Sequence, residues 1–280
     1  MSKSAWSAYW QSGARRGCLP GASDAVQGAL ASLWQDFAGT LPQGARLLDL
    51  ACGTGAVLDA ISSVRPDLDL LGVDSATLPP SPQHRLLAEV DCAALPFPDR
   101  HFVAIASQFG LEYCPLPARV EAARVLAPGG KIQLLMHSTE SRAIAHNAAR
   151  LAAMRALEKA GLFRLARQAV AGIRVPGDAV AVAAARAAHQ NQGIATELPL
   201  ALEQARAASR PLDQIAAIER RAQAEMERLA AMTTAAHSAQ DIAGLVADFE
   251  SAGVQMVARK LEVSGEGNLG WVVTGRKTGV

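Results

Sequence analysis

The segment Leu47–Leu58, LLDLACGTGAVL, constrains the fold of this chain more than any other part of its sequence. Its first half is an apolar strand pattern, its centre is a glycine-rich turn, and a helical pattern follows at once. Gly53 and Gly55 allow the backbone to approach a ligand closely, where a Cβ atom would collide. Because such turns lie at the carboxyl ends of parallel strands, the segment predicts an α/β fold with a nucleotide-type ligand site.

Short apolar segments alternate with helical ones along the first half of the chain. This alternation is typical of a parallel sheet with helices on both faces. Near the C-terminus, two further strand patterns flank the loop SGEGNL and predict a hairpin. We therefore expect an α/β fold with a doubly wound, mostly parallel seven-stranded sheet, a terminal antiparallel hairpin and an α-helical insertion. The expected strands are Arg46–Leu50, Leu68–Val73, Arg85–Val90, Phe102–Ala106, Lys131–Met136, Val254–Val263 and Gly270–Thr274.

The middle of the chain has a different character. From about residue 141 to residue 236 it is rich in alanine and shows almost no strand pattern, and Pro176, Pro199 and Pro211 divide it into three or four expected helices. We predict a core of residues 23–140 and 237–280, an insertion at 141–236, and an N-terminal arm at 1–22 that folds over the site as a lid or packs on the core. The insertion is interpreted as a lid over an acceptor, as an arm that forms a homodimer, or as a rigid addition.

Composition argues against several classes of protein. The 27 basic and 26 acidic residues leave a net charge of +1, whereas nucleic-acid-binding proteins usually show a basic excess. The cysteines Cys18, Cys52, Cys92 and Cys114 have neither CxxC nor Cys/His ligand spacing, so neither a disulfide framework nor a metal site is predicted. No apolar run is long enough to cross a membrane and the first residues do not resemble a signal peptide, so we expect a soluble, cytoplasmic protein.

Two common nucleotide-binding motifs do not fit the glycine turn. The NAD-binding pattern GxGxxG needs a third glycine where this chain has Leu58, and the P-loop needs Gly-Lys-Ser/Thr after the turn. An NAD site also leaves Asp49, in the first strand, without an explanation. A ligand that carries the ammonium group of an amino acid would explain this acid.

Four ordered motifs resemble those of the class I S-adenosylmethionine-dependent methyltransferases, especially the group of ubiquinone and menaquinone methyltransferases. DLACGTG is similar to the first motif of that family, and Asp74 falls where the family has its ribose-binding acid. Asp91-Cys92 with the following LPFPD resembles the adenine-contacting motif, and RVLAPGG resembles the signature before the fifth strand. The resemblance covers about residues 45–136 and 254–277. It departs from the family at 77–84, where prolines replace a helix.

The resemblance implies S-adenosylmethionine as the cofactor. Asp49 is then expected to bind the ammonium group of the cofactor, Asp74 the ribose, and Asp91 with the backbone of Cys92 the adenine. The alternative role for Asp49 is that of a capping acid in a tight turn. The residues expected to bind the cofactor are Asp49, Ala51, Gly53, Gly55, Asp74, Ser75, Asp91, Cys92 and Gln108.

Contacts with an acceptor are expected from Tyr9, Trp10, Phe109 and Tyr113, because the scarce aromatic residues gather in segments that we place near the mouth of the site. His137 ends the fifth strand at the same edge of the sheet, and imidazole is a common general base. The alternative for His137 is a strand-end histidine whose ring is held by the backbone.

The predicted function is methyl transfer from S-adenosylmethionine to an O, N or C atom of a small molecule. Residues 107–110, SQFG, are not the Asn/Asp-Pro-Pro-aromatic motif of methylases that act on adenine or glutamine, and no Pro-Cys follows the fourth strand. The alternatives are an aminopropyl or carboxymethyl transferase that uses a related cofactor, and a non-catalytic cofactor-binding subunit with a regulatory or assembly role.

Overall fold

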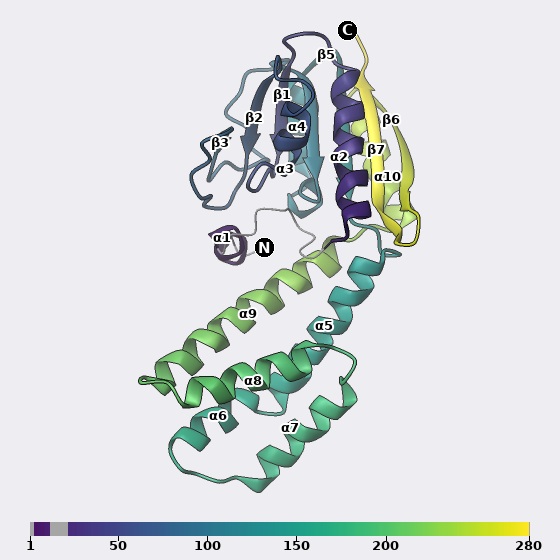
Figure 1. The fold of residues 1–280 in the computed structure, drawn as a ribbon. Helices are drawn as coiled ribbons and strands as arrows, with labels where there is room; N and C mark the ends of the chain where they lie inside the picture. Colours follow the sequence, from purple (N-terminus) through teal and green to yellow (C-terminus); the bar gives the residue numbers. More distant parts are fainter. Residues whose placement is uncertain (1–2, 12–21, 280) are drawn as a thin grey trace. The chain divides into compact units, whose positions relative to one another are not determined.

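The computed structural model describes residues 3–11 and 22–279, which form two compact units. The first unit contains the described residues of 1–144 together with 235–279, and the second contains residues 145–234. Figure 1 shows the first unit as a sheet with its helices and the second as a group of helices. Of the expected N-terminal arm, residues 1–2 and 12–21 lie outside the described residues.

The first unit is built on a seven-stranded sheet with the strand order β3-β2-β1-β4-β5-β7-β6. Strands β1 to β5 pair in parallel, whereas β7 runs antiparallel to both β5 and β6. The predicted fold class, including the terminal antiparallel hairpin, is confirmed. The strands are β1 Arg46–Leu50, β2 Asp69–Val73, β3 Arg85–Leu87, β4 Phe102–Gln108, β5 Leu126–Met136, β6 Val254–Val263 and β7 Gly267–Lys277.

Helices cover the sheet in two layers. Helix α2 contacts α3, and α4 contacts α10. The crossovers β1-α3-β2 and β4-α4-β5 progress in opposite directions from the centre of the sheet, so right-handed connections place α3 and α4 on opposite faces. The helices of this unit, with the short 3-10 helix η1, are α1 Lys3–Gln11, α2 Asp24–Gly39, α3 Ala56–Ser62, η1 Leu111–Tyr113, α4 Pro117–Val125 and α10 Ala239–Ser251.

Strand β3 is shorter than predicted. It ends at Leu87 and not at Val90, because Glu89 has a positive φ of 60° and the chain turns back beside the end of β2. The turn is held by two backbone hydrogen bonds, in which the Asp74 amide donates to the Leu87 carbonyl and the Val90 amide donates to the Asp74 carbonyl. The end of β2 is therefore fixed against the loop that follows β3.

Strand β5 begins earlier than predicted. Leu126 already pairs with Phe102, and the register then shifts before Lys131 pairs with Ala104. The Pro128-Gly129-Gly130 step lies inside this irregular stretch, which is a β-bulge. The predicted start at Lys131 is thus the point where regular pairing begins.

The second unit, together with the residues that flank it, contains five helices and not the three or four that we expect from the sequence. All residues from 142 to 235 are described, so this number refers to a complete segment. Their buried apolar side chains form a separate core that includes Leu157, Leu202 and Leu229. The helices are α5 Arg142–Lys159, α6 Leu162–Val170, α7 Pro176–Ala188, α8 Ile194–Arg206 and α9 Pro211–Ala235.

Pro176 and Pro211 begin helices, as is usual for proline, but Pro199 lies inside α8. A proline at this position has no amide to donate to the carbonyl of Ala195, one turn earlier. The side chain of Arg186 replaces that donor, because its Nε lies 3.2 Å from the Ala195 carbonyl oxygen. The division that we expect at Pro199 is therefore wrong.

No helix is predicted for Ala239–Ser251, yet this segment forms α10. Ser238 and Asp241 make a capping box: the Ser238 hydroxyl accepts from the Asp241 amide, and the Asp241 carboxylate accepts from the Ser238 amide. Over residues 3–11 and 22–279, no helix has both the length and the apolar character needed to cross a bilayer.

Candidate functional site

The glycine turn between β1 and α3 has an unusual backbone. Ala51, Gly53 and Gly55 all adopt positive φ angles, of 52°, 53° and 91°. A Cβ atom at Gly53 would lie 2.4 Å from Cζ2 of Trp10, so the ring of Trp10 and the left-handed backbone both require glycine there. Ala51 carries the cost of a left-handed conformation without being glycine, and such strain is common at functional sites.

Asp74, at the end of β2, holds this turn in place. Its Oδ2 accepts from the Gly53 amide at 2.8 Å, and its Oδ1 accepts from the Ala76 amide at 2.8 Å. The side chain is buried, and burial raises the pKa of Asp74 although the amide hydrogen bonds oppose the rise. Loss of this carboxylate would leave buried amides without an acceptor, at a cost of roughly 1–3 kcal/mol for each.

Asp49 is the most unusual side chain of the site. It is fully buried at 0% exposure, and neither carboxylate oxygen has a hydrogen-bond partner among the described residues. Burial raises the pKa of Asp49 well above its ordinary value, and the neighbouring Asp74 and Cys92 raise it further. A buried acid without a donor is poorly solvated, so a cationic group that reaches it would be strongly bound.

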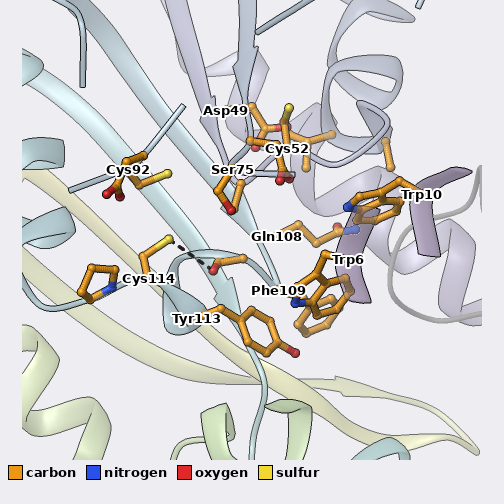
Figure 2. A pocket seen from close by; sticks show the side chains of 17 residues that line it. Trp6, Trp10, Asp49, Cys52, Ser75, Cys92, Gln108, Phe109, Tyr113 and Cys114 are labelled. Atoms are coloured by element: carbon orange, nitrogen blue, oxygen red, sulfur yellow. Dashed lines mark hydrogen bonds between the residues drawn. The ribbon is translucent and has the colours of Figure 1, made fainter. Parts of the chain in front are cut away.

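A cavity of about 230 Å³ opens at the carboxyl ends of these strands. Figure 2 shows Trp6 and Trp10 on one side of it and Cys92 with Cys114 on the opposite side. The lining combines one acid in β1 and two acids in the segments after β2 and β3 with aromatic rings from α1 and from the segment after β4. It consists of Trp6, Trp10, Asp49, Ala51, Cys52, Ala56, Val57, Asp74, Ser75, Asp91, Cys92, Gln108, Phe109, Gly110, Tyr113, Cys114 and Pro115.

The cavity brings together most of the residues that the sequence predicts for the site. Of the expected cofactor-binding residues, Gly53 and Gly55 do not line it: Gly53 faces the ring of Trp10, and Gly55 faces the imidazole of His84. The remainder line it, namely Asp49, Ala51, Asp74, Ser75, Asp91, Cys92 and Gln108. Of the residues predicted to contact an acceptor, Trp10, Phe109 and Tyr113 line the cavity, whereas Tyr9 packs against Trp10 with ring centroids 4.9 Å apart.

Trp6 lies in an aromatic-rich segment that the sequence predicts near the mouth of the site, although it is not among the predicted acceptor contacts, and it lines the cavity. It is stacked on Trp10 with centroids 6.0 Å apart, and it meets Tyr113 edge-on at 5.2 Å. Trp6 and Trp10 are four residues apart on α1, so the helical spacing of the two tryptophans is a signal that could have found them as a pair. Cys52, Cys114 and Pro115 also line the cavity without such a signal.

The end of β4 is fixed by buried polar contacts. The Ser107 hydroxyl donates to the Leu50 carbonyl at 2.8 Å and accepts from the Leu111 amide at 3.0 Å, which ties β1, β4 and η1 together. Phe109 has a positive φ of 51°, and its amide donates to Leu135. Gln108 accepts from the indole of Trp34 at 2.7 Å, which fixes its side chain in the cavity wall.

His137 does not line the cavity. It is buried behind Phe109, with ring centroids 4.3 Å apart, and its Nδ1 lies 2.8 Å from Oε1 of Glu112. The same carboxylate oxygen accepts from the His137 amide at 3.0 Å. Nε2 of His137 and Oε2 of Glu112 are buried and have no hydrogen-bond partner among the described residues. The imidazole is thus held by a carboxylate and not by the backbone. Because Glu112 follows the fourth strand beside Tyr113, the sequence predicts that it lines the mouth of the site, but it does not line the cavity and instead binds His137.

The residues of the cavity fit the cofactor that the sequence implies. Asp49 lacks a donor, as a binding site for an ammonium group requires, and Asp74 has the chemistry to accept from ribose hydroxyls. In the described part of the chain, no group of three or more His, Cys, Asp or Glu side chains is arranged to hold a metal ion. The site therefore offers carboxylates and aromatic rings as its binding groups.

We expect Asp49→Asn to flatten the pH dependence of stability. The folded state keeps the Asp49 proton at pH values where the unfolded chain, with a carboxyl pKa near 3.9, has lost it. The free energy of unfolding should therefore fall as the pH rises above about 4, by about 1.4 kcal/mol per unit, until the raised pKa is reached. Urea unfolding between about pH 5 and pH 8 measures this, as the difference between wild type and variant.

The matched control is Asp36→Asn, which removes an exposed carboxylate from α2. Its pH profile should run parallel to that of the wild type. If the Asp49→Asn profile also runs parallel to the wild-type profile, the buried, protonated state of Asp49 is contradicted.

Residues 48–134 match a family model described as a methyltransferase domain. The ubiquinone/menaquinone biosynthesis C-methyltransferase UbiE of Laribacter hongkongensis is 33% identical over 133 residues, which cover 41% of this chain and 54% of that protein. The demethylmenaquinone methyltransferase of Thermus thermophilus is 36% identical over 104 residues, which cover 32% of this chain and 46% of that protein. The chain spans about half the length of the curated relatives that it matches.

Among solved structures, a chain of the complex between the Haloferax volcanii Trm112 methyltransferase activator and a methyltransferase has the same fold. It is 12% identical, with a TM-score of 0.52 and coverage of 98% of both chains. The residues matched by the family model run from β1 to β5 and include the glycine turn, Asp49, Asp74 and Asp91. Residues 48–134 therefore match a methyltransferase domain, and this part of the chain is similar to ubiquinone/menaquinone methyltransferases.

Proposed function

We propose that this protein transfers a methyl group from S-adenosylmethionine to a small-molecule acceptor. The observation that carries the proposal is Asp49, a fully buried carboxylate without a hydrogen-bond partner among the described residues, beside a glycine turn. A ligand with a positively charged ammonium group supplies the missing partner. The names of the curated relatives, which are quinone-pathway methyltransferases, support the same activity.

Each acid of the cavity has a role in this proposal. Asp49 binds the ammonium group of the methionine part, Asp74 accepts hydrogen bonds from the ribose, and Asp91 with Cys92 contacts the adenine. Asp74 is suited to its role because the Gly53 and Ala76 amides already fix its orientation. The bound cofactor would supply a sulfonium methyl group that is ready for displacement.

For the acceptor we propose a small, planar, largely apolar compound such as a phenol or a quinol. Trp6, Trp10, Phe109 and Tyr113 supply four aromatic rings to the cavity wall, and such rings favour flat ligands through stacking and edge-to-face contacts. The relatives act, by their names, on ubiquinone or menaquinone precursors, which agrees with a ring-shaped acceptor.

For proton removal from the acceptor we propose His137, acting through Nε2, with Glu112 holding Nδ1 in place. Phe109 lines the cavity and packs on the imidazole, so this role requires the Phe109 ring to turn aside when the acceptor binds. Without that movement, the Glu112–His137 pair acts as a positioning element that anchors η1, and with it Tyr113, to the end of β5.

Replacement of Asp49 by Asn should weaken binding of S-adenosylmethionine at least about thirtyfold, since loss of one partner of a buried charge pair costs about 2–5 kcal/mol. Titration calorimetry measures the affinity. The same variant should bind methylthioadenosine about as well as the wild type, because that ligand lacks the amino-acid part. Asp36→Asn is the matched control and should bind both ligands normally.

Failure of the wild-type protein to bind either S-adenosylmethionine or S-adenosylhomocysteine would refute the proposed function. Equal loss of affinity for methylthioadenosine in Asp49→Asn would show that Asp49 acts on the pocket as a whole and not on the ammonium group. Cofactor binding without formation of S-adenosylhomocysteine from any phenol or quinol would favour the non-catalytic alternative.

A kinetic comparison of His137→Gln with Glu112→Gln distinguishes the two roles of this pair. If His137 is the base, we expect kcat with reduced naphthoquinone to fall by about 10²–10⁴ in His137→Gln, with the rate recovering at high pH. Glu112→Gln should retain more activity, because it keeps the base and loses only its anchor. If both variants instead show the same change in KM and no change in kcat, His137 and Glu112 position the site and His137 is not the base.

A further inference from the structure

Arg124, the first residue of the RVLAPGG motif, lies on α4 and does not line the cavity, yet its side chain is fully engaged. Its Nε donates to one carboxylate oxygen of Glu121 at 2.6 Å, and its Nη2 donates to the other at 2.8 Å. Nη2 also donates to the Leu95 carbonyl at 3.1 Å, and Nη1 donates to the Phe97 carbonyl at 2.9 Å and to Asp99 at 2.7 Å. These five hydrogen bonds use all five N–H donors of the guanidinium group.

Three of these partners lie in the LPFPD segment, residues 95–99, of the loop between β3 and β4. Glu121 binds the same segment, because its Oε2 accepts from the Leu95 amide at 2.8 Å. The backbone carbonyl of Arg124 accepts from the Arg100 amide at 3.0 Å. Glu121 and Arg124 are three residues apart on α4 and so face the same side of the helix. Helix α4 therefore holds residues 95–100 through these two residues.

Opposite charges strengthen this contact between α4 and the loop. The hydrogen bonds with Glu121 and then with Asp99 raise the pKa of Arg124, and the hydrogen bond with Arg124 lowers the pKa of Glu121. Charge-assisted bidentate pairs of this kind are among the stronger hydrogen bonds in proteins. A lysine could not replace Arg124, because an ammonium group has three donors on one nitrogen and cannot reach partners that are spread around a planar fork.

The loop between β3 and β4 also carries Asp91 and Cys92 into the wall of the cavity. One carboxylate oxygen of Asp91 accepts from the Ala93 amide at 2.9 Å, and the Asp91 carbonyl accepts from the Ala94 amide at 3.0 Å. Leu95 follows this tight turn directly and is buried in the same apolar core as Cys92. The place of Asp91 in the wall thus depends on where Leu95 is held.

We propose that Arg124 is a positioning residue for the adenine part of the cofactor: by holding the LPFPD segment, it sets where Asp91 and Cys92 lie in the cavity wall. This role rests on the proposed function, which places adenine against these two residues. A carboxylate only accepts hydrogen bonds, so the group of adenine that Asp91 can bind is its exocyclic amino group. A hydrogen bond weakens steeply when its angle is distorted, so a shift of the loop would reduce recognition of that amino group.

The test compares two ligands, S-adenosylhomocysteine and S-inosylhomocysteine, in which an oxygen replaces the amino group of adenine. Titration calorimetry on the full chain should show that the wild type prefers S-adenosylhomocysteine at least about tenfold, as one hydrogen bond to a charged group would give. Arg124→Lys should lower this preference to about twofold, while its affinity for S-inosylhomocysteine stays within about threefold of the wild-type value. A general loss of folded protein would lower both affinities together and leave the preference unchanged.

A double-mutant cycle with Asp91→Ala shows whether Arg124 acts through Asp91. Asp91→Ala removes the contact itself and should abolish the preference. Adding Arg124→Lys to it should cost no further preference, because no contact is left to position. The matched control is Arg119→Lys, also on α4, whose ion pair is with Asp248 of α10 and not with the loop. It should keep the wild-type preference.

Hydrogen exchange of the ligand-free protein provides a second measurement. In Arg124→Lys, the amides of residues 91–100 should exchange faster, whereas those of residues 47–58 should exchange as in the wild type. If Arg124→Lys does not fold, Glu121→Gln replaces it in both measurements. Glutamine still accepts from the Leu95 amide but loses the charge, so a smaller loss of preference is expected.

An unchanged preference in Arg124→Lys, or an equal lowering of the preference by Arg124→Lys in the Asp91→Ala background, would overturn the positioning role. Equal binding of the two ligands by the wild type would overturn the adenine contact on which this role rests. If the wild type binds neither ligand, the proposed function and the adenine role both fail, and hydrogen exchange alone decides whether Arg124 holds the loop.

Discussion

Two carboxylates at the ends of neighbouring strands organise this site, and they do so in opposite ways. Asp74 accepts one hydrogen bond on each carboxylate oxygen, from the Gly53 and Ala76 amides, and so fixes the turn after β1. Asp49, on the adjacent strand, has no such donors among the described residues and stays buried. Asp74 therefore holds the turn of the pocket in place, and Asp49 supplies a buried carboxyl group that a cationic ligand would satisfy.

The backbone around these acids carries strain that the fold holds in place. Ala51 and Phe109 are non-glycine residues with left-handed backbones, and they follow β1 and β4, the two central strands on which the cavity opens. Gly110 packs closely against Ala51, because a Cβ atom at position 110 would lie 2.7 Å from the Cβ atom of Ala51. The two turns therefore fit against one another, and a larger residue in either would displace both.

Local patterns were sufficient to predict the sheet and the acids of the site. The apolar runs and the glycine turn depend on short-range rules, so β1, β6 and the order of motifs followed from the sequence. The sequence does not predict which way Gly53 faces, because this depends on Trp10, some forty residues away. It also does not predict the pairing of Glu112 with His137, because that pairing depends on β5 lying beside β4. Pro199 was misinterpreted for a related reason, since the Arg186 side chain that supports it comes from another helix.

The two roles expected for the helical unit, a lid or a dimerisation arm, stay predictions. Its alanine and leucine pattern determines which faces are buried within the unit, but not what the remaining surface contacts. Ile173, Val180, Leu200 and Leu212 are each more than half exposed. The boundaries predicted for the core, the insertion and the arm are likewise proposals.

Cofactor binding, as we propose it, requires a buried Asp49 that is protonated in the free protein and becomes charged when the ammonium group of the cofactor binds. Proton release on binding tests this most directly. Calorimetric titration with S-adenosylmethionine at a series of pH values above about 4, each in two buffers of different ionisation enthalpy, should show proton release on binding, and Asp49→Asn should abolish it. A binding enthalpy that is independent of the buffer, or equal proton release in the variant, would contradict the account.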